Sequence, residues 1–166
     1  MADKLSGRII EMAYRNPDTS LRIDALPVPE DPPVQSGGGG LFTTAGDYSK
    51  LLQAVLKAGE GQATILHQGT VDEMFRPQLD GAVRSTLQAV LAGTPLFSST
   101  NNYNHGLSGV INMVGIDGKR REGALAWGGM SGPQWWIDRK AGIAALLFVN
   151  IMANSDEIVP TLLVNQ

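Results

Sequence analysis

Hydrophobic residues follow a helical spacing in the first part of the chain and a strand-like spacing in the last part. Between Tyr48 and Leu56 they recur every three or four positions, after a capping sequence that begins at Thr44 and before Gly59. This segment is the strongest predicted helix. The same reasoning predicts helices over 1–15, with Asp3 as its cap, 68–75, 81–92 and 155–166.

Beyond residue 106 the pattern becomes that of an antiparallel sheet. The segment Ile143 to Val149 is almost wholly apolar, which predicts a central strand covered on both faces. The chain is therefore expected to be an α+β protein with an antiparallel sheet flanked by helices. The other predicted strands are 107–114, 122–127 and 134–138, with a hairpin turn at Asp117-Gly118.

The segment from residue 16 to residue 40 is predicted to be one long loop. It contains five prolines, shows no clear periodicity and ends in the run Gly37 to Gly40, for which close packing is favoured over phosphate binding. With 166 residues, of which 43% are hydrophobic, the chain has the size of one domain. Its predicted parts are the helix 1–15, the loop 16–40, the helical region 41–94, the strands of 107–150 and the terminal helix 155–166.

Charge and composition exclude several classes of function. A formal net charge of -3 gives no basic surface for nucleic acid, and the one basic cluster, Lys119 to Arg121, is predicted to be a solvated hairpin tip. There is no cysteine, and the two histidines have no carboxylate at ligand spacing, so neither a metal nor another cofactor is expected. No apolar run could span a bilayer, and we expect a soluble, cytoplasmic protein without a membrane partner.

The most informative local pattern is Trp127-Gly128-Gly129 at the end of a predicted strand. Glycine has no Cβ atom, so a ligand can approach the backbone closely there, and the neighbouring tryptophan offers a flat apolar floor. A tight hairpin with buried aromatic residues would give the same pattern. The local sequence alone leaves both interpretations open.

Three blocks of sequence resemble, in order and spacing, the C-terminal half of the serine β-lactamase and penicillin-binding-protein superfamily. These blocks run from Ser36 to Tyr48, from Trp127 to Gly132, and from Trp136 to Asp138 followed by an apolar strand. Within that superfamily the chain looks most like the class C-related esterases and acyltransferases. The resemblance implies the C-terminal portion of the β-lactamase/transpeptidase-like fold and a serine hydrolase acting on small-molecule esters or related acyl substrates.

The same resemblance implies roles for individual residues. The backbone N–H of Met130 would form one half of an oxyanion hole. Trp127, Gly128 and Gly129 would line the substrate cleft, together with His105 from the segment that corresponds to the family's cleft-lining Tyr-Gly segment. Relatives that bind carboxylated β-lactams carry Lys-Thr-Gly at this strand, so Trp-Gly-Gly favours a neutral ester or thioester.

The family's nucleophile is a serine followed three positions later by lysine, and no serine of this chain has that spacing. We therefore expect the nucleophile in an upstream half of the fold, the chain alone to be inactive, and its partner to be that half or a second copy. Two alternatives stay open, namely a non-catalytic binding or interaction module and an enzyme that uses Ser131. Tyr14-Arg15-Asn16 and His67-Gln68-Gly69 imitate family motifs and are read as a helix end and a helix start.

Overall fold

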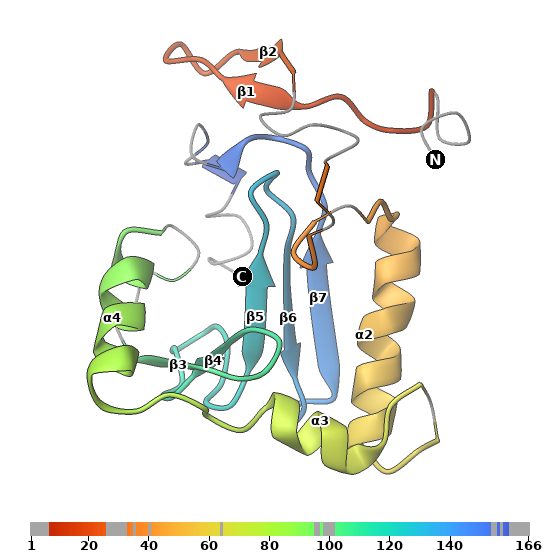
Figure 1. Ribbon diagram of the computed structural model, residues 1–166, viewed down its shortest axis with the longest axis vertical. Helices are drawn as coiled ribbons and strands as arrows, with labels where there is room; N and C mark the ends of the chain where they lie inside the picture. The colour runs from red at the N-terminus through yellow and green to blue at the C-terminus, as the bar shows by residue number, and fades with distance from the viewer. Residues whose placement is uncertain are drawn as a thin grey trace.

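A five-stranded antiparallel sheet organises the chain (Figure 1). The computed structural model describes residues 7–25, 33–34, 36–39, 41–63, 65–94, 97, 102–153, 156 and 158–159. The strands lie in the order of the sequence, and the α+β prediction is confirmed. They are β3 (Tyr103–His105), β4 (Val110–Asn112), β5 (Leu125–Gly128), β6 (Gln134–Asp138) and β7 (Ile143–Leu147), and the helices are α2 (Ala45–Gly59), α3 (Gln68–Met74) and α4 (Gly81–Ala92).

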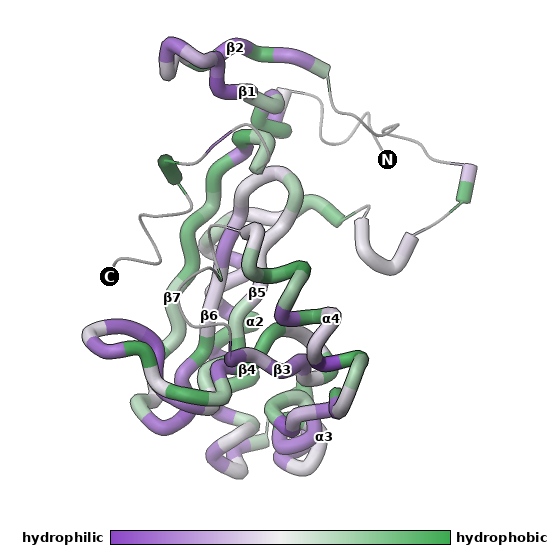
Figure 2. Tube along the Cα trace, turned by 90° about the vertical axis from the view of Figure 1, so that its left-hand side faces the viewer, coloured by the Kyte–Doolittle hydropathy of each residue, from purple (hydrophilic) through white to green (hydrophobic). Residues whose placement is uncertain are grey.

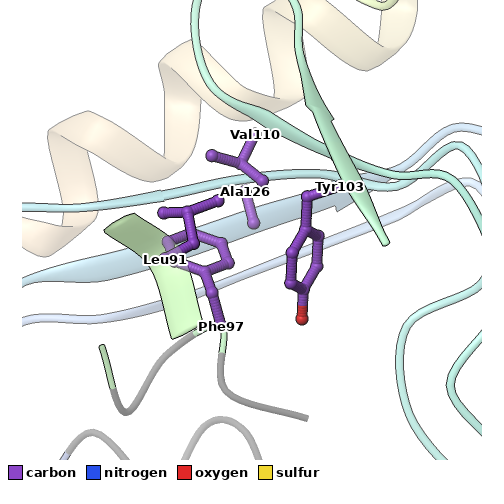
Figure 3. Close-up of a cluster of buried hydrophobic side chains, with 5 residues drawn as sticks. All are labelled: Leu91, Phe97, Tyr103, Val110 and Ala126. Atoms are coloured by element: carbon purple, nitrogen blue, oxygen red, sulfur yellow. The ribbon is translucent and has the colours of Figure 1, made fainter. Parts of the chain in front are cut away.

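The two faces of the sheet carry separate hydrophobic cores. Ala126 lies opposite Trp136 in the register, and side chains at opposite positions share a face while the next residue, Ile137, points to the other face. The first face packs against α4, in the cluster that Figure 3 draws: Leu91, Phe97, Tyr103, Val110 and Ala126. The second face packs against α2 and α3 through Leu52, Val55, Ala58, Val71 and Ile137.

Helix α2 forms where its capping sequence and apolar spacing predict it. The side chain of Thr44 accepts a hydrogen bond from the N–H of Asp47 (3.1 Å), which satisfies one of the free donors of the first turn. Asp47 near the N-terminus and Lys57 near the C-terminus both complement the helix dipole. This helix then buries its apolar stripe against β6 and β7.

The predicted N-terminal helix is wrong over residues 7–15, because residues 7–12 form turns and irregular chain and residues 13–15 form the first strand of a β-hairpin. Strand β1 (Ala13–Arg15) pairs with β2 (Leu21–Ile23), which in turn lies inside the predicted loop 16–40. A turn at Asn16 to Ser20 joins them, because the N–H of Thr19 donates to the carbonyl of Asn16 and the N–H of Asn16 donates to the carbonyl of Ser20. Residues 1–6, where the predicted helix begins with Asp3, lie outside the described residues.

The glycine run does not show the predicted close packing where it is described. A Cβ atom placed on Gly37 or on Gly39 would meet no described atom within 4 Å. Gly40 lies outside the described residues. The described residues therefore leave space for a side chain at Gly37 and at Gly39.

Strand β7 is an edge strand, so the prediction of a central strand is wrong for the part of the chain that the structure describes. It pairs with β6, and no described strand pairs with its other edge (Figure 2). Ile143 is half exposed, and an apolar groove of about 380 Å³ runs between β7 and α2. Apolar composition predicts that a strand will be covered, but it does not say which segment covers it.

The basic cluster is not a uniformly solvated hairpin tip. The turn itself forms as predicted, with Gly118 at a positive φ, but Arg120 is buried. Its guanidinium carbon lies 5.7 Å from the centre of the Phe97 ring, a cation–π geometry. Burial lowers the pKa of Arg120 from its ordinary value.

The ion pair between Arg15 and Asp156 joins the hairpin to the C-terminal segment. Arg15 Nε lies 2.8 Å from Asp156 Oδ1, and the Asp156 side chain is 2% exposed. The same oxygen accepts hydrogen bonds from the N–H groups of Ile158 and Val159, the pattern of a helix N-cap. Asp156 therefore caps as predicted, while Ser155, Glu157 and residues 160–166 of the predicted terminal helix lie outside the described residues.

No helix among the described residues is both long enough and apolar enough to cross a membrane. In the same residues, no three His, Asp or Glu side chains come together in a way that could hold a metal ion.

The hairpin turn predicts a stabilising substitution. Thr19 has a φ of 69°, a left-handed conformation that costs an L-residue about 1–2 kcal/mol and suits a β-branched side chain poorly. Thr19→Gly removes that strain and adds freedom to the unfolded chain, so we expect the free energy of unfolding to rise by about 0.5–1 kcal/mol. Urea denaturation measures it. Thr43→Gly, at an exposed loop residue without positive φ, is the control and should bring no gain; equal effects of the two substitutions would contradict the strain.

The Arg15–Asp156 ion pair predicts a pH dependence of stability. Burial alone would raise the pKa of Asp156, but the hydrogen bonds from Arg15, Ile158 and Val159 outweigh it and hold this pKa below its ordinary value. A carboxyl with a lowered folded pKa stabilises fully above its unfolded pKa, about 4, and loses that effect as the pH falls through the folded pKa. The difference in unfolding free energy between wild type and Asp156→Asn should therefore be largest near pH 7 and shrink below pH 4. A difference that stays constant down to pH 2.5 would contradict this linkage.

Candidate active site

A tight turn between β5 and β6 holds the residues that the sequence singles out. The N–H of Gly132 donates to the carbonyl of Gly129 (3.0 Å), and the N–H of Gly129 donates to the carbonyl of Pro133 (2.9 Å). These bonds make Met130 and Ser131 the two central residues of a β-turn. We call residues 129–133 the tip turn.

The backbone N–H of Met130 has no hydrogen-bond partner in the described part of the chain. Among the described residues no group accepts a hydrogen bond from it, and Met130 is 53% exposed. Across a trans peptide the C=O and N–H bonds point in opposite directions. Because the carbonyl of Gly129 points into the turn toward Gly132, the N–H of Met130 points out of it. The tip turn therefore presents one outward backbone donor, as an oxyanion hole requires.

Trp127 and His105 contact each other on the sheet that leads to this turn. Their ring centres are 5.5 Å apart with an angle of 76° between the planes, an edge-to-face contact, and Trp127 is 42% exposed. The Nδ1 atom of His105 lies 2.5 Å from the carbonyl oxygen of Gly106, so Nδ1 carries a proton and donates it. This bond fixes the orientation of the imidazole against Trp127.

Glycine at position 106 lets α3 support the His105 loop. A Cβ atom there would lie 2.0 Å from the carbonyl oxygen of Met74, the last residue of α3. That oxygen accepts a hydrogen bond from the N–H of Leu107, and the carbonyl of His105 accepts one from the N–H of Gln78. The backbone on both sides of His105 is thereby anchored to the segment around α3.

The tip turn also packs tightly against the segment that follows β7. A Cβ atom on Gly132 would lie 2.7 Å from the carbonyl oxygen of Ile151 and 2.8 Å from the side chain of Val149, and Gly132 has a φ of +87°. The N–H of Ile151 donates to the carbonyl of Ser131 (3.0 Å), and the N–H of Ala153 donates to the carbonyl of Met130 (2.9 Å). We call residues 150–153 the support segment.

The structure keeps the other candidate residues apart from this chemistry. The hydroxyl of Ser131 makes no hydrogen bond within the described part of the chain, so no base activates it there. Tyr14 lies on β1 rather than at a helix end, and its hydroxyl donates to the carbonyl of Ala25 (2.9 Å). His67 is the residue before α3, so its reading as a helix start is confirmed.

Sequence reasoning misses the support segment and the hairpin that touches it. The one available signal is Gly132-Pro133, because a glycine just before a proline at a strand start marks a turn where another backbone can approach. Nothing local in the sequence indicates which backbone that is. The helical interpretation of residues 1–15 also hides the role of Arg15.

Comparison with known proteins identifies the family. The family model described as Beta-lactamase matches residues 11–165 of this chain. The chain belongs to the beta-lactamase family. The resemblance of the three sequence blocks to that superfamily is thus confirmed, and so is the corresponding fold.

Individual relatives of this beta-lactamase family member are acyltransferases and an esterase. Monacolin J acid methylbutanoyltransferase from Aspergillus terreus is 31% identical over 130 residues, which cover 74% of this chain and 31% of the relative. Acyltransferase calJ from Penicillium decumbens is 30% identical over 146 residues, which cover 84% of this chain and 34% of the relative. Lovastatin esterase from Penicillium rubens is 33% identical over 116 residues, which cover 66% of this chain and 28% of the relative.

A solved structure of similar shape supports the same assignment. Unliganded simvastatin synthase (LovD) from Aspergillus terreus superposes with a TM-score of 0.82 at 29% sequence identity, and the match covers 96% of this chain and 41% of that one. The chain therefore spans about a third of the length of the curated relatives and 41% of the solved structure.

The contact at Gly132 predicts a local and costly substitution. Gly132→Ala adds both backbone strain and a clash with Ile151, so we expect the free energy of unfolding to fall by about 2–4 kcal/mol. Gly118→Ala is a matched control, because Gly118 also has a positive φ (+67°) but no described atom within 4 Å of its Cβ position. It should cost only about 1 kcal/mol. Urea denaturation of both variants checks this, and an equal loss would show that the support segment does not press on the turn.

Proposed function

We propose that this chain is part of a serine acyltransferase or esterase, in which it supplies the cleft wall and one donor of the oxyanion hole. The observation that carries the proposal is the outward N–H of Met130 on the tip turn, which has no partner among the described residues and lies three residues after the half-exposed Trp127. Such a donor stabilises the negative oxygen of a tetrahedral intermediate. The acyl-transfer chemistry of the relatives supports the same reading.

The proposed substrate is a neutral ester or thioester with an apolar acyl group. Trp127 presents an aromatic surface at the turn, and its neighbours Gly128 and Gly129 leave the backbone open to a flat ligand. The three residues provide no cation to hold a substrate carboxylate. His105, fixed against the ring of Trp127, completes this wall.

The reaction needs a nucleophile from polypeptide outside these 166 residues. A serine hydroxyl oxygen attacks the acyl carbonyl carbon and passes its proton to a neighbouring base, here the lysine of a Ser-x-x-Lys helix. The carbonyl oxygen becomes negatively charged and accepts a hydrogen bond from the N–H of Met130. The intermediate then expels a protonated alcohol or thiol, and the acyl-serine passes its acyl group to water or to a second alcohol.

We propose that the polypeptide with this nucleophile covers the free edge of β7. The groove beside that edge is apolar, lined by Leu52, Leu56, Ala144 and Leu146 among others, and no described strand pairs with the outer side of β7. The length of the relatives supplies more than enough chain to fill it. Light scattering tests this, with a complex expected when the polypeptide encoded directly upstream is added. A stable monomer that does not bind the upstream polypeptide would contradict the proposal. A homodimer would indicate that a second copy of the chain covers the edge of β7.

The function is tested by removing the one proposed donor. Met130→Pro deletes the N–H, and proline suits the first central position of this turn, so the turn should persist. With the upstream polypeptide present, we expect kcat for a neutral p-nitrophenyl ester to fall about 10²–10³-fold. Met130→Ala keeps the N–H and should retain kcat within a few-fold.

The same assay separates this function from its alternatives. Wild-type complex should prefer the neutral ester over one with a carboxylated acyl chain. Turnover by the chain alone that Ser131→Ala abolishes would favour an independent enzyme. Binding of acyl ligand without turnover, or an upstream sequence that lacks Ser-x-x-Lys, would instead favour a non-catalytic binding module.

A further inference from the structure

The orientation of the Met130 N–H depends on two peptide planes, and a different contact holds each one. The plane between Gly129 and Met130 is held from inside the turn, by the bond from Gly132 to the carbonyl of Gly129. The plane between Met130 and Ser131 is held from outside, because the carbonyl of Met130 accepts the N–H of Ala153 (2.9 Å). The support segment therefore fixes one side of the residue that carries the donor.

The support segment is itself held by β1. The N–H of Ala13 donates to the carbonyl of Asn150 (2.9 Å), and the N–H of Met152 donates to the carbonyl of Ala13 (2.9 Å). These bonds form an isolated parallel bridge between Ala13 and Ile151. Residues 150–153 thus lie as an extended layer between β1 on one side and the tip turn on the other, and Figure 1 shows the hairpin beyond the tips of β5 and β6.

The contact between β1 and the C-terminal segment ends in one ion pair. Arg15 lies two residues after Ala13, and Asp156 lies three residues after Ala153, so the pair lies just beyond the backbone bonds that the described residues make between β1 and the support segment. The exposed fractions of the two side chains are 15% and 2%. Arg15 also donates from Nη1 to the carbonyl of Thr19 (2.8 Å), which ties the ion pair to the hairpin turn. An ion pair this well buried holds a defined geometry, and removing one partner leaves the other uncompensated.

We propose that Arg15 and Asp156 are a positioning pair for the oxyanion-hole donor. The pair holds β1 against the support segment. This contact maintains the hydrogen bonds from the N–H groups of Ile151 and Ala153 to the carbonyls of the tip turn, and these bonds keep the N–H of Met130 pointing outward. Neither side chain needs to touch the substrate. This inference rests on the proposed function of Met130, but its structural half can be measured without any catalysis.

Amide hydrogen exchange on the ¹⁵N-labelled chain tests the structural half. In Arg15→Ala and in Asp156→Asn, the amides of Ile151 and Ala153 should exchange at least about 10-fold faster, with a shifted Met130 resonance and unchanged amides in α2. Arg15→Lys should restore much of the protection. Arg22→Ala is the matched control, because Arg22 lies on the same hairpin and pairs with Asp24 on its exposed side.

The exchange data can overturn the inference in two ways. Unchanged exchange at Ile151 and Ala153 in both variants would show that the ion pair does not hold the support segment. Equal acceleration there and in α2 would show a global loss of stability instead of positioning. If Arg15→Ala does not fold, Asp156→Asn, which keeps the size and shape of the side chain, decides between these outcomes.

Kinetics with the upstream polypeptide tests the functional half. Arg15→Ala should lower kcat about 10–100-fold and leave KM within about twofold, because a misaimed donor weakens binding of the transition state and not of the substrate. Arg15→Lys should recover most of kcat. A raised KM with unchanged kcat would overturn the inference. If even the wild type shows no turnover, the proposed function fails, and the exchange data alone decide whether the pair positions the turn.

Discussion

The approach of two backbones at Gly132 is the constraint on which the candidate site depends. The carbonyl of Ile151 comes so close that no side chain fits at this position. That distance lets the N–H groups of Ile151 and Ala153 reach the carbonyls of the tip turn. The shape of the turn depends on a segment about 20 residues further along the chain. That segment is hydrogen-bonded to β1 near the N-terminus. A small donor site is thereby built from three distant parts of the sequence.

Local patterns in the sequence predict the elements whose structure is decided locally. Helix α2 carries its own cap at Thr44 and its own apolar stripe, and β6 has the same bounds in the sequence and in the structure. The hairpin of β1 and β2 is different, because its turn uses Thr19 at a positive φ where a glycine would have given a signal. Without that signal, the apolar residues before it match a helical spacing equally well.

Burial depends on partners that local patterns do not name. Arg120 looks like a surface residue in the sequence, yet its side chain is buried and its guanidinium lies over the ring of Phe97. The apolar run of β7 predicts a central strand covered on both faces, while the described residues supply a neighbouring strand on one edge. The site shows the same division. The turn around Met130 follows from its motif, whereas Arg15 and Asp156 are 141 residues apart and only the fold brings them together.

The arrangement of the tip turn bears on how an enzyme of this family can be assembled. Oxyanion stabilisation is effective when the donor is already oriented before charge develops, since no free energy is then lost in turning it. The hydrogen bonds from Gly132 to the carbonyl of Gly129 and from Ala153 to the carbonyl of Met130, which orient the two peptide planes around Met130, both come from this chain. In the proposed enzyme, the donor would therefore be oriented by contacts within this chain, before the polypeptide with the nucleophile associates. Association at the distant edge of β7 would have to place a serine correctly, but it would not have to build the oxyanion donor as well.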